Sequence, residues 1–186
     1  YSSTSAMIDI PIQYRGDAYL IVVADGNYQL DEYPNDSNNA KAMHFYIDPV
    51  PFSDLVAGAV TAPDQATHGS TITVQYKVSN LGSATTQGLT ASVNSWTDTI
   101  WLSKDKTRPD PAKGDILLSS VTHQGNLAVG EDYLGNTQVT LPDNVLSGEY
   151  YITVWSDTYN AILEDTLASN LNPDDPNQVD NNNYKA

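Results

Sequence analysis

Apolar and polar residues alternate along many short stretches of the chain. Residues 71–78 read Thr-Ile-Thr-Val-Gln-Tyr-Lys-Val, and residues 98–103 and 150–155 show the same two-residue period. This period places one face of a strand toward a core and the other toward solvent. No long stretch keeps the 3.6-residue period of a helix. The pattern therefore predicts an all-β protein.

Turn-forming residues separate these stretches, as at Arg108–Pro111 and Asp25–Asn27. The segment Asn80-Leu81-Gly82 predicts a tight turn, because Asn and Gly both tolerate positive φ. We expect an immunoglobulin-like antiparallel β-sandwich of about seven strands. The strands predicted for its main part cover residues 54–61, 71–79, 88–93, 98–103, 115–122, 134–141, 149–156 and 182–186.

An internal repeat links the two ends of the chain. Residues 16–25 (GDAYLIVVAD) match residues 148–157 (GEYYITVWSD) without a gap, 132 positions later. Residues 38–42 match residues 182–186 at an offset of 144, so the second copy carries 12 extra residues (144 − 132). Ile10-Pro11 likewise resembles Leu141-Pro142. Such self-similarity predicts a tandem repeat of like modules.

The repeat also predicts the domain organisation. We interpret residues 1–48 as the C-terminal strands of a preceding immunoglobulin-like repeat and residues 53–186 as one nearly complete repeat. Residues 49–52 form a linker that its prolines stiffen. Two or three strands alone are marginally stable in water. We therefore expect the missing strands of the first repeat to come from a longer chain or from another copy.

The chain is strongly acidic. Its 186 residues include 8 Lys and Arg against 23 Asp and Glu, which gives a formal net charge of −15 at pH 7. This charge repels phosphate backbones and anionic lipids, so it argues against nucleic-acid binding. The chain has no Cys, which excludes disulfides and Cys-bound zinc. No apolar run is long enough to span a membrane.

Several short motifs follow one another along the chain: Asp54–Val56, Gly69–Val74, Tyr76–Gly82, Ser95–Asp105, Leu127–Gly130, Gly148–Tyr151, Asp157, Glu164 and Asn182-Asn183. Their order resembles the CARDB family, the cell-adhesion-related modules of immunoglobulin-like fold found in tandem in large secreted bacterial proteins. The resemblance covers residues 54–186, with residues 1–48 as a C-terminal remnant. It implies a non-enzymatic spacer or adhesive unit that is secreted and lies at the cell surface.

Two groups of carboxylates are candidate calcium sites, because a hard divalent ion takes oxygen ligands from loops. The first group is Asp105, Asp110 and Asp115, which resembles the aspartate-bearing loop of many CARDB modules. Its alternative is a solvated loop with weak local ion pairs, because the same segment carries Lys104, Lys106, Arg108 and Lys113.

The second group follows the strand that ends at Trp155-Ser156. It contains Asp157, Glu164 and Asp180, and its counterparts in the first copy include Asp25 and Glu32. Crowded carboxylates repel one another unless a cation or solvent relieves them. The spacing of an EF-hand is absent.

The sequence carries no catalytic signature. His44, His68 and His123 lie in unrelated contexts, and neither Gly-x-Ser-x-Gly nor His-Glu-x-x-His occurs. We therefore predict no enzymatic activity, no catalytic residues and no cofactor other than calcium.

The function predicted from these features is a structural or adhesive repeat of an extracellular bacterial surface or filament protein. We expect it to be rigidified by calcium and to assemble with neighbouring copies or modules by strand complementation. The alternative is a glycan- or protein-binding accessory module of a secreted enzyme, with Tyr28, Tyr33 and Tyr159 holding sugars. The tryptophans are expected to fill the core between the sheets, with carbohydrate stacking as their alternative role; they are Trp96, Trp101 and Trp155.

Calcium binding predicts a higher melting temperature. An ion that binds only the folded chain stabilises it by mass action, by about 2.7 kcal/mol at 100 times its Kd. We expect the Tm in millimolar calcium to exceed the Tm in excess chelator by several degrees, with magnesium as the control ion. Equal Tm values in calcium and in chelator would show that calcium does not bind the folded chain.

Overall fold

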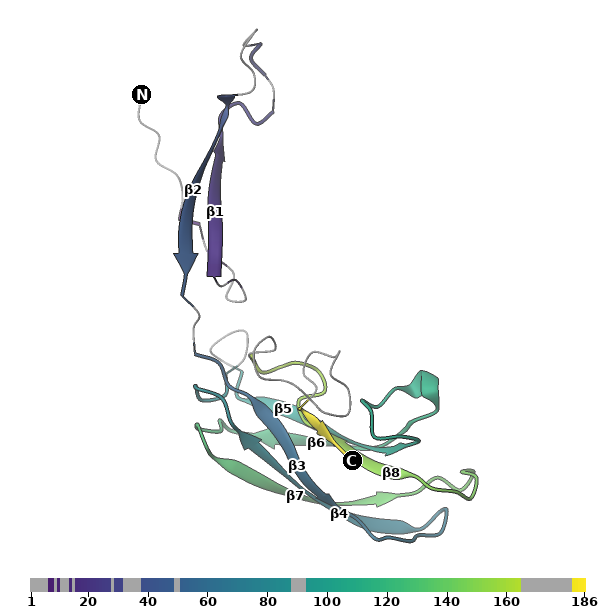
Figure 1. Ribbon diagram of the computed structural model, residues 1–186. Coiled ribbons are helices and arrows are strands. Elements are labelled where there is room, and N and C mark those ends of the chain that lie inside the picture. Colours follow the sequence, from purple (N-terminus) through teal and green to yellow (C-terminus); the bar gives the residue numbers. More distant parts are fainter. Residues whose placement is uncertain are drawn as a thin grey trace. The chain divides into compact units, whose positions relative to one another are not determined.

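The computed structural model describes residues 7–8, 10, 14, 16–27, 29–31, 38–48, 51–87, 93–164 and 182–186 (Figure 1). The chain forms two compact units, Tyr1–Val50 and Pro51–Ala186. Within the described residues no helix is long and apolar enough to cross a membrane.

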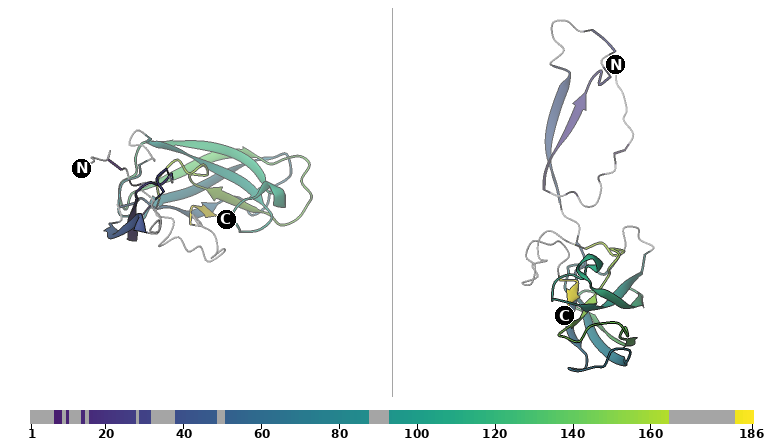
Figure 2. Two further views of the ribbon diagram at one scale, coloured as in Figure 1. Left: turned by 90° about the horizontal axis from the view of Figure 1, so that it is seen from above. Right: turned by 90° about the vertical axis from the view of Figure 1, so that its right-hand side faces the viewer.

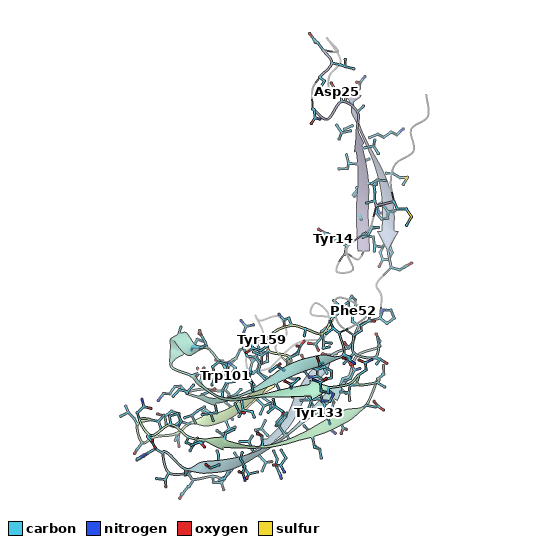
Figure 3. The ribbon with its side chains drawn as sticks, turned by 180° about the vertical axis from the view of Figure 1, so that it is seen from behind. Tyr14, Asp25, Phe52, Trp101, Tyr133 and Tyr159 are labelled. Atoms are coloured by element: carbon cyan, nitrogen blue, oxygen red, sulfur yellow. The ribbon has the colours of Figure 1, made fainter. Side chains whose placement is uncertain are left out.

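The first unit contains one antiparallel hairpin of β1 (Gly16–Val23) and β2 (Ala40–Ile47). The register runs without a shift from Gly16↔Ile47 to Val23↔Ala40. The continuous apolar run in β1 is typical of a strand that is buried on both faces. Most of its large apolar side chains are nevertheless exposed, and Figure 3 shows side chains projecting from the hairpin.

The second unit contains two antiparallel sheets (Figures 1 and 2). The three-stranded sheet has the order β3-β4-β7, and the four-stranded sheet has the order β6-β5-β8-β9. This arrangement confirms the predicted all-β antiparallel sandwich; of the predicted strand 88–93, residues 88–92 lie outside the described residues. The strands are β3 (Leu55–Thr61), β4 (Thr71–Asn80), β5 (Ser95–Ser103), β6 (Ile116–Gln124), β7 (Asp132–Thr140), β8 (Tyr151–Trp155) and β9 (Tyr184–Lys185), with a 3₁₀ turn, η2 (Pro111–Lys113), between β5 and β6.

The inward-facing residues of the strands fill the space between the two sheets. On β4, Val74 and Val78 are fully buried, and on β5 Ile100 is fully buried. Burying one such side chain contributes about 1.5–3 kcal/mol. The alternation read from the sequence therefore identifies the faces of these strands correctly.

The tryptophans divide between the two faces of the four-stranded sheet. Trp96 belongs to the buried core, as predicted. Trp101 and Trp155 alternate with the core residues of β5 and β8 and lie on the outer face, where the Trp101 indole N–H donates to Thr99 Oγ1 at 2.8 Å. Trp101 is buried, at 8% exposed, but neither side chain belongs to the cluster between the sheets, so the prediction that these two fill that core was wrong.

Asn80 ends β4 as a fully buried side chain whose amide is completely hydrogen-bonded. Its Oδ1 accepts from the N–H groups of Asp54 and Gly82, each at 3.1 Å. Its Nδ2 donates to the carbonyl oxygens of Ala84 at 2.8 Å and Leu127 at 2.9 Å. One amide thus joins the start of β3, the end of β4 and the loop before β7.

Gly82 is required for space and not for a positive φ. Neither Gly82 nor Asn80 is among the described residues with positive φ, so the predicted conformational reason for this pair was wrong. A Cβ on Gly82 would lie 2.5 Å from the Phe52 carbonyl oxygen and 2.6 Å from the Asp54 nitrogen. The turn can therefore pass the start of β3 only as glycine.

Asn80→Asp changes one amide nitrogen to an oxygen and is expected to destabilise the second unit by roughly 3 kcal/mol. The new carboxylate oxygen would face two carbonyl oxygens where Nδ2 now donates. Urea unfolding followed by tryptophan fluorescence measures the loss. Asn126→Asp makes the same chemical change at an exposed residue and serves as the control. Equal stability of the two variants would show that the amide hydrogen bonds of Asn80 do not hold this junction.

Candidate functional site

The loop between β5 and β6 carries the first predicted calcium group. Asp115 is buried, and its carboxylate accepts from Lys104 N at 2.9 Å and from Asp110 N at 2.8 Å. Asp110 caps η2 by accepting from Ala112 N at 2.9 Å, and Asp105 accepts from Thr107 N at 2.8 Å. The hydrogen bonds from Thr107 hold the pKa of Asp105 below its usual value. All three carboxylates therefore shape the loop by binding main-chain N–H groups.

The basic side chains of the same loop contact aromatic rings at and near β8. Lys104 Nζ lies 4.0 Å from the ring centroid of Tyr150 and donates to its hydroxyl at 2.8 Å. Lys106 Nζ lies 5.4 Å from the Tyr151 ring, and Arg108 Cζ lies 5.5 Å from the Trp155 ring. These distances are within the range of cation–π attraction. We call Lys104, Lys106 and Arg108 the basic loop; none of them forms an ion pair with a described carboxylate.

Asp157 and Asp25 occupy equivalent turns in the two units. Asp157 has a φ of 46° and Asp25 a φ of 47°, a left-handed conformation that Asp tolerates better than most residues. The Asp157 carboxylate accepts from the N–H groups four and five residues ahead, both at 2.9 Å. Asp25 accepts from the N–H groups at the same two spacings, both at 2.8 Å. Both aspartates therefore close a turn after a strand.

Glu164 joins the C-terminal part of the second unit to the beginning of β3. Its two carboxylate oxygens accept from the N–H of Leu55 and from the side-chain amide of Asn183. Asn182 extends the junction, because its carbonyl accepts from Ala57 N at 2.9 Å and its amide donates to Asp54 Oδ1 at 2.8 Å. Ser53 and Glu164 form a parallel β-bridge. We call this set of bonds between residues 53–57 and residues 164, 182 and 183 the terminal clasp.

The structure brings together only some of the predicted calcium ligands. Asp105, Asp110 and Asp115 share one loop, whereas Asp25 lies in the other unit. Glu32 and Asp180 lie outside the described residues. Within the part of the chain that the structure describes, no three Asp, Glu or His side chains are placed to hold a metal ion together. Calcium binding at these residues stays a prediction.

Of the tyrosines predicted to hold sugars, the structure describes one. Tyr159 is exposed, and Figure 3 shows it on the same side of the second unit as Trp101. Tyr28 and Tyr33 lie outside the described residues. Among the histidines, His44 Nε2 donates to Asp17 Oδ1 at 2.7 Å on the hairpin, and His123 lies on β6.

A buried carboxylate that the sequence analysis did not single out lies inside the sandwich. Asp98 on β5 is fully buried, and its Oδ2 accepts from the hydroxyls of Tyr133 at 2.6 Å and Tyr76 at 3.1 Å. These tyrosines belong to β7 and β4, so the carboxylate joins the two sheets. The two-residue alternation of β5 could have identified it, because Asp98 lies at an inward-facing position between Trp96 and Ile100.

Aromatic rings surround this carboxylate. The His123 ring lies 4.1 Å from the Trp96 ring and 4.1 Å from the Tyr133 ring, and the Trp96 indole N–H donates to Tyr133 Oη at 3.1 Å. Burial raises the pKa of Asp98, although its hydrogen bonds oppose that shift. Burial also raises the pKa of Tyr133 and lowers that of His123. The arrangement is a structural network, because these hydroxyls are held in their neutral, donating form.

Asp98→Asn tests which protonation state of Asp98 the fold favours. Burial raises the pKa of Asp98 in the folded chain above 3.8, so folding favours its neutral form. Its contribution to the free energy of unfolding is full below the pKa of the unfolded chain and is lost as the pH rises through the pKa of the folded chain. We expect the unfolding free energy of the unaltered chain to fall relative to that of the variant as the pH rises above about 4, by about 1.4 kcal/mol per unit of pKa shift.

Urea unfolding at several pH values measures this difference. Asp64→Asn removes the same charge from an exposed residue and is the control for changes in net charge. If the unfolding free energy of the unaltered chain instead rises relative to that of Asp98→Asn with increasing pH, the pKa of Asp98 is lowered and not raised. The hydrogen bonds to its carboxylate would then outweigh the effect of burial.

Comparisons with known proteins place this sandwich in a family. The family model of CARDB matches residues 52–173. No curated protein sequence matches the chain. Among solved structures, β-glucosidase 3B from Thermotoga neapolitana in complex with α-D-glucose is similar at 17% identity and a TM-score of 0.40, over 65% of this chain. The aligned part spans 16% of the length of that protein.

The family match and the fold agree. The matched segment begins at Phe52, which is buried directly before β3, and extends beyond the terminal-clasp residue Glu164. It therefore contains both sheets except for the short strand β9. Because the match covers well over half of the residues, the chain belongs to the CARDB family, a family of non-catalytic modules typical of extracellular bacterial proteins.

Proposed function

We propose that this chain is a structural and adhesive repeat segment of an extracellular bacterial surface or filament protein, and that it has no catalytic activity of its own. Membership of the CARDB family supports this role. The buried polar residues support it as well, because Asn80, Asp98 and Glu164 are each hydrogen-bonded to other parts of the sandwich. Such residues stabilise strand positions.

The terminal clasp is the observation that carries the proposal. It joins the first residues of β3 to the last residues of the second unit through main-chain and side-chain hydrogen bonds. A force applied to the two ends of this unit acts on these bonds before it reaches the core. The parallel bridge between Ser53 and Glu164 means that several bonds bear the load together. A spacer or adhesive module requires this kind of mechanical resistance.

We also propose that the chain is built from repeats, with residues 1–48 as the last strands of one repeat, residues 49–52 as the linker and residues 53–186 as the next repeat. The equivalent turns at Asp25 and Asp157 support this organisation. Their φ angles differ by one degree, and both carboxylates accept from the same two relative positions.

We propose calcium as an additional stabiliser of the clasp. Asn183 Oδ1 and Asn182 Oδ1 are buried acceptor oxygens with no hydrogen-bond partner among the residues that the structure describes, and Asn183 donates its amide to Glu164. Oxygen atoms of this kind suit a hard divalent cation. An ion here would tie the C-terminal segment to β3 more firmly.

The alternative function, a ligand-binding accessory module of a secreted enzyme, has one supporting observation. The basic loop places three cations, none paired with a described carboxylate, over the rings of Tyr150, Tyr151 and Trp155. Aromatic faces bind sugar rings and cations bind acidic groups. An acidic glycan is therefore the ligand that this surface would suit.

Single-molecule pulling of the full chain tests the mechanical role. We expect the second unit to unfold in one event with a contour-length gain of roughly 45 nm. Glu164→Gln should lower the unfolding force, because its amide nitrogen cannot accept a hydrogen bond at the clasp. Glu149→Gln, at an exposed residue, should leave the force unchanged. Extension without a force peak, or equal forces for both variants, would contradict a load-bearing clasp.

A further inference from the structure

The hairpin of the first unit has the same register as the last two strands of the second unit. In β1 and β2, Val22 pairs with Lys41 and Val23 pairs with Ala40. In β8 and β9 the pairs are Val154↔Lys185 and Trp155↔Tyr184. Each strand residue in the second unit lies 132 positions after its β1 counterpart or 144 positions after its β2 counterpart. The offsets of the sequence repeat are therefore also the offsets of the strand pairing.

The bonds beyond the strand ends agree with this register. Ala24 N donates to Asn39 O at 2.8 Å, and its counterpart Ser156 N donates to Asn183 O at 2.7 Å. The turns that follow begin with the equivalent residues Asp25 and Asp157. Two strands, the bond that closes them and the next turn are thus shared between the units.

The two hairpins differ in what lies at their other edge. In the second unit, β8 pairs on that side with β5, from Thr99↔Trp155 to Ser103↔Tyr151. In the first unit, β2 is the only described strand that pairs with β1. The five β1 residues equivalent to the β5-paired part of β8 are large, apolar and exposed: Tyr19, Leu20, Ile21, Val22 and Val23.

The exposed fractions of two equivalent valines show the effect of the missing neighbouring strand. Val154 on β8 is 0% exposed, and the equivalent Val22 on β1 is 62% exposed. Side chain and register are the same at the two positions, so the missing neighbours account for the contrast. An isolated two-stranded hairpin is at best marginally stable in water, and its free edge is a template for another strand.

The residues before β1 indicate where those neighbours belong in the chain. Ile10-Pro11 corresponds to Leu141-Pro142 at an offset of 131, and at that offset Ile8 corresponds to Val139 in β7. Leu141 is 8% and Val139 is 2% exposed, whereas Ile10 is 48% and Ile8 is 68% exposed. The order of apolar positions that leads from β7 into β8 therefore also leads into β1.

We propose that β1 is an acceptor edge for a β5-type strand, and that this strand belongs to a CARDB sandwich encoded upstream of β1 in the same polypeptide. In that assembly Leu20 and Val22 would enter the core of the upstream sandwich, as Ile152 and Val154 do in the second unit. The inference rests on the repeat organisation proposed above and adds the partner, its register and the side chains that it buries.

The test supplies the missing strands in the predicted order. A second copy of residues 51–140 is joined in front of Ile10, which gives an extended chain that retains everything from Ile10 to Ala186. Hydrogen exchange is measured for Tyr19–Val23 in the extended chain and in the unaltered chain. We expect β1 amides to exchange at least about tenfold more slowly in the extended chain. The main-chain amide of Trp101 in the added copy should be as well protected as that of Trp101 in the second unit.

Val22→Asp provides the matched control. In the unaltered chain Val22 is exposed, so the variant should leave the Tm unchanged; in the extended chain it should abolish the added protection. Unchanged exchange of β1, an added copy that stays unfolded, or protection of β1 in dimers of the unaltered chain would each overturn the proposal. The pulling experiment reports on the second unit alone, so it can succeed when this one fails.

Discussion

Hydrogen bonds from main-chain N–H groups to buried or capping side chains hold the strand ends of this protein in place. A buried N–H without an acceptor is costly, and this chain often satisfies it with a carboxylate or amide. Asn80, Asp115, Asp157 and Glu164 each accept at least one such bond. Apart from the short η2, the described part of the sandwich has no helix to cover its loops, and it depends on these acceptors to join segments that are distant in the sequence.

This use of side-chain acceptors changes how the acidic composition is understood. A net charge of −15 suggests that the carboxylates lie at the surface, either solvated or bound to cations. In the structure, each described carboxylate of the predicted calcium set has a donor from the protein, which partly offsets its negative charge. The preference for Asp over Glu follows from the same geometry, because a short side chain can reach the N–H groups of its own turn.

Two-residue alternation predicted the strands well because each strand has one face against the core. For β4 and β5 the inward residues were identifiable from the sequence, and β7 and β8 differ from the predicted ranges by about two residues at their ends. Such differences are ordinary for element boundaries. Asp98 was missed because a charged residue in an inward position has no explanation until the tyrosines of the opposite sheet are placed beside it.

Other features could not be assigned from local patterns. Alternation with Ile100 and Val154 turns Trp101 and Trp155 outward, but the contact of Arg108 with the Trp155 ring depends on the path of the loop between β5 and β6, which the sequence alone does not indicate. The space required at Gly82 depends on Phe52, thirty residues earlier. The internal repeat was more informative, because equal offsets in sequence carry over directly to equal strand pairing.

The basic loop also makes the surface electrically asymmetric. With Lys113, its three residues make up four of the eight Lys and Arg residues, and Asp105 and Asp110 in the same segment offset two of these charges. Residues 104–113 thus carry a net charge of +2 and the remainder of the chain −17 (−15 − 2). Two such molecules repel each other in most orientations over about 10 Å at 0.1 M salt. The exception is an approach that brings the basic loop of one molecule toward the acidic surface of another. The charge pattern thus gives the module a preferred direction of encounter as well as solubility.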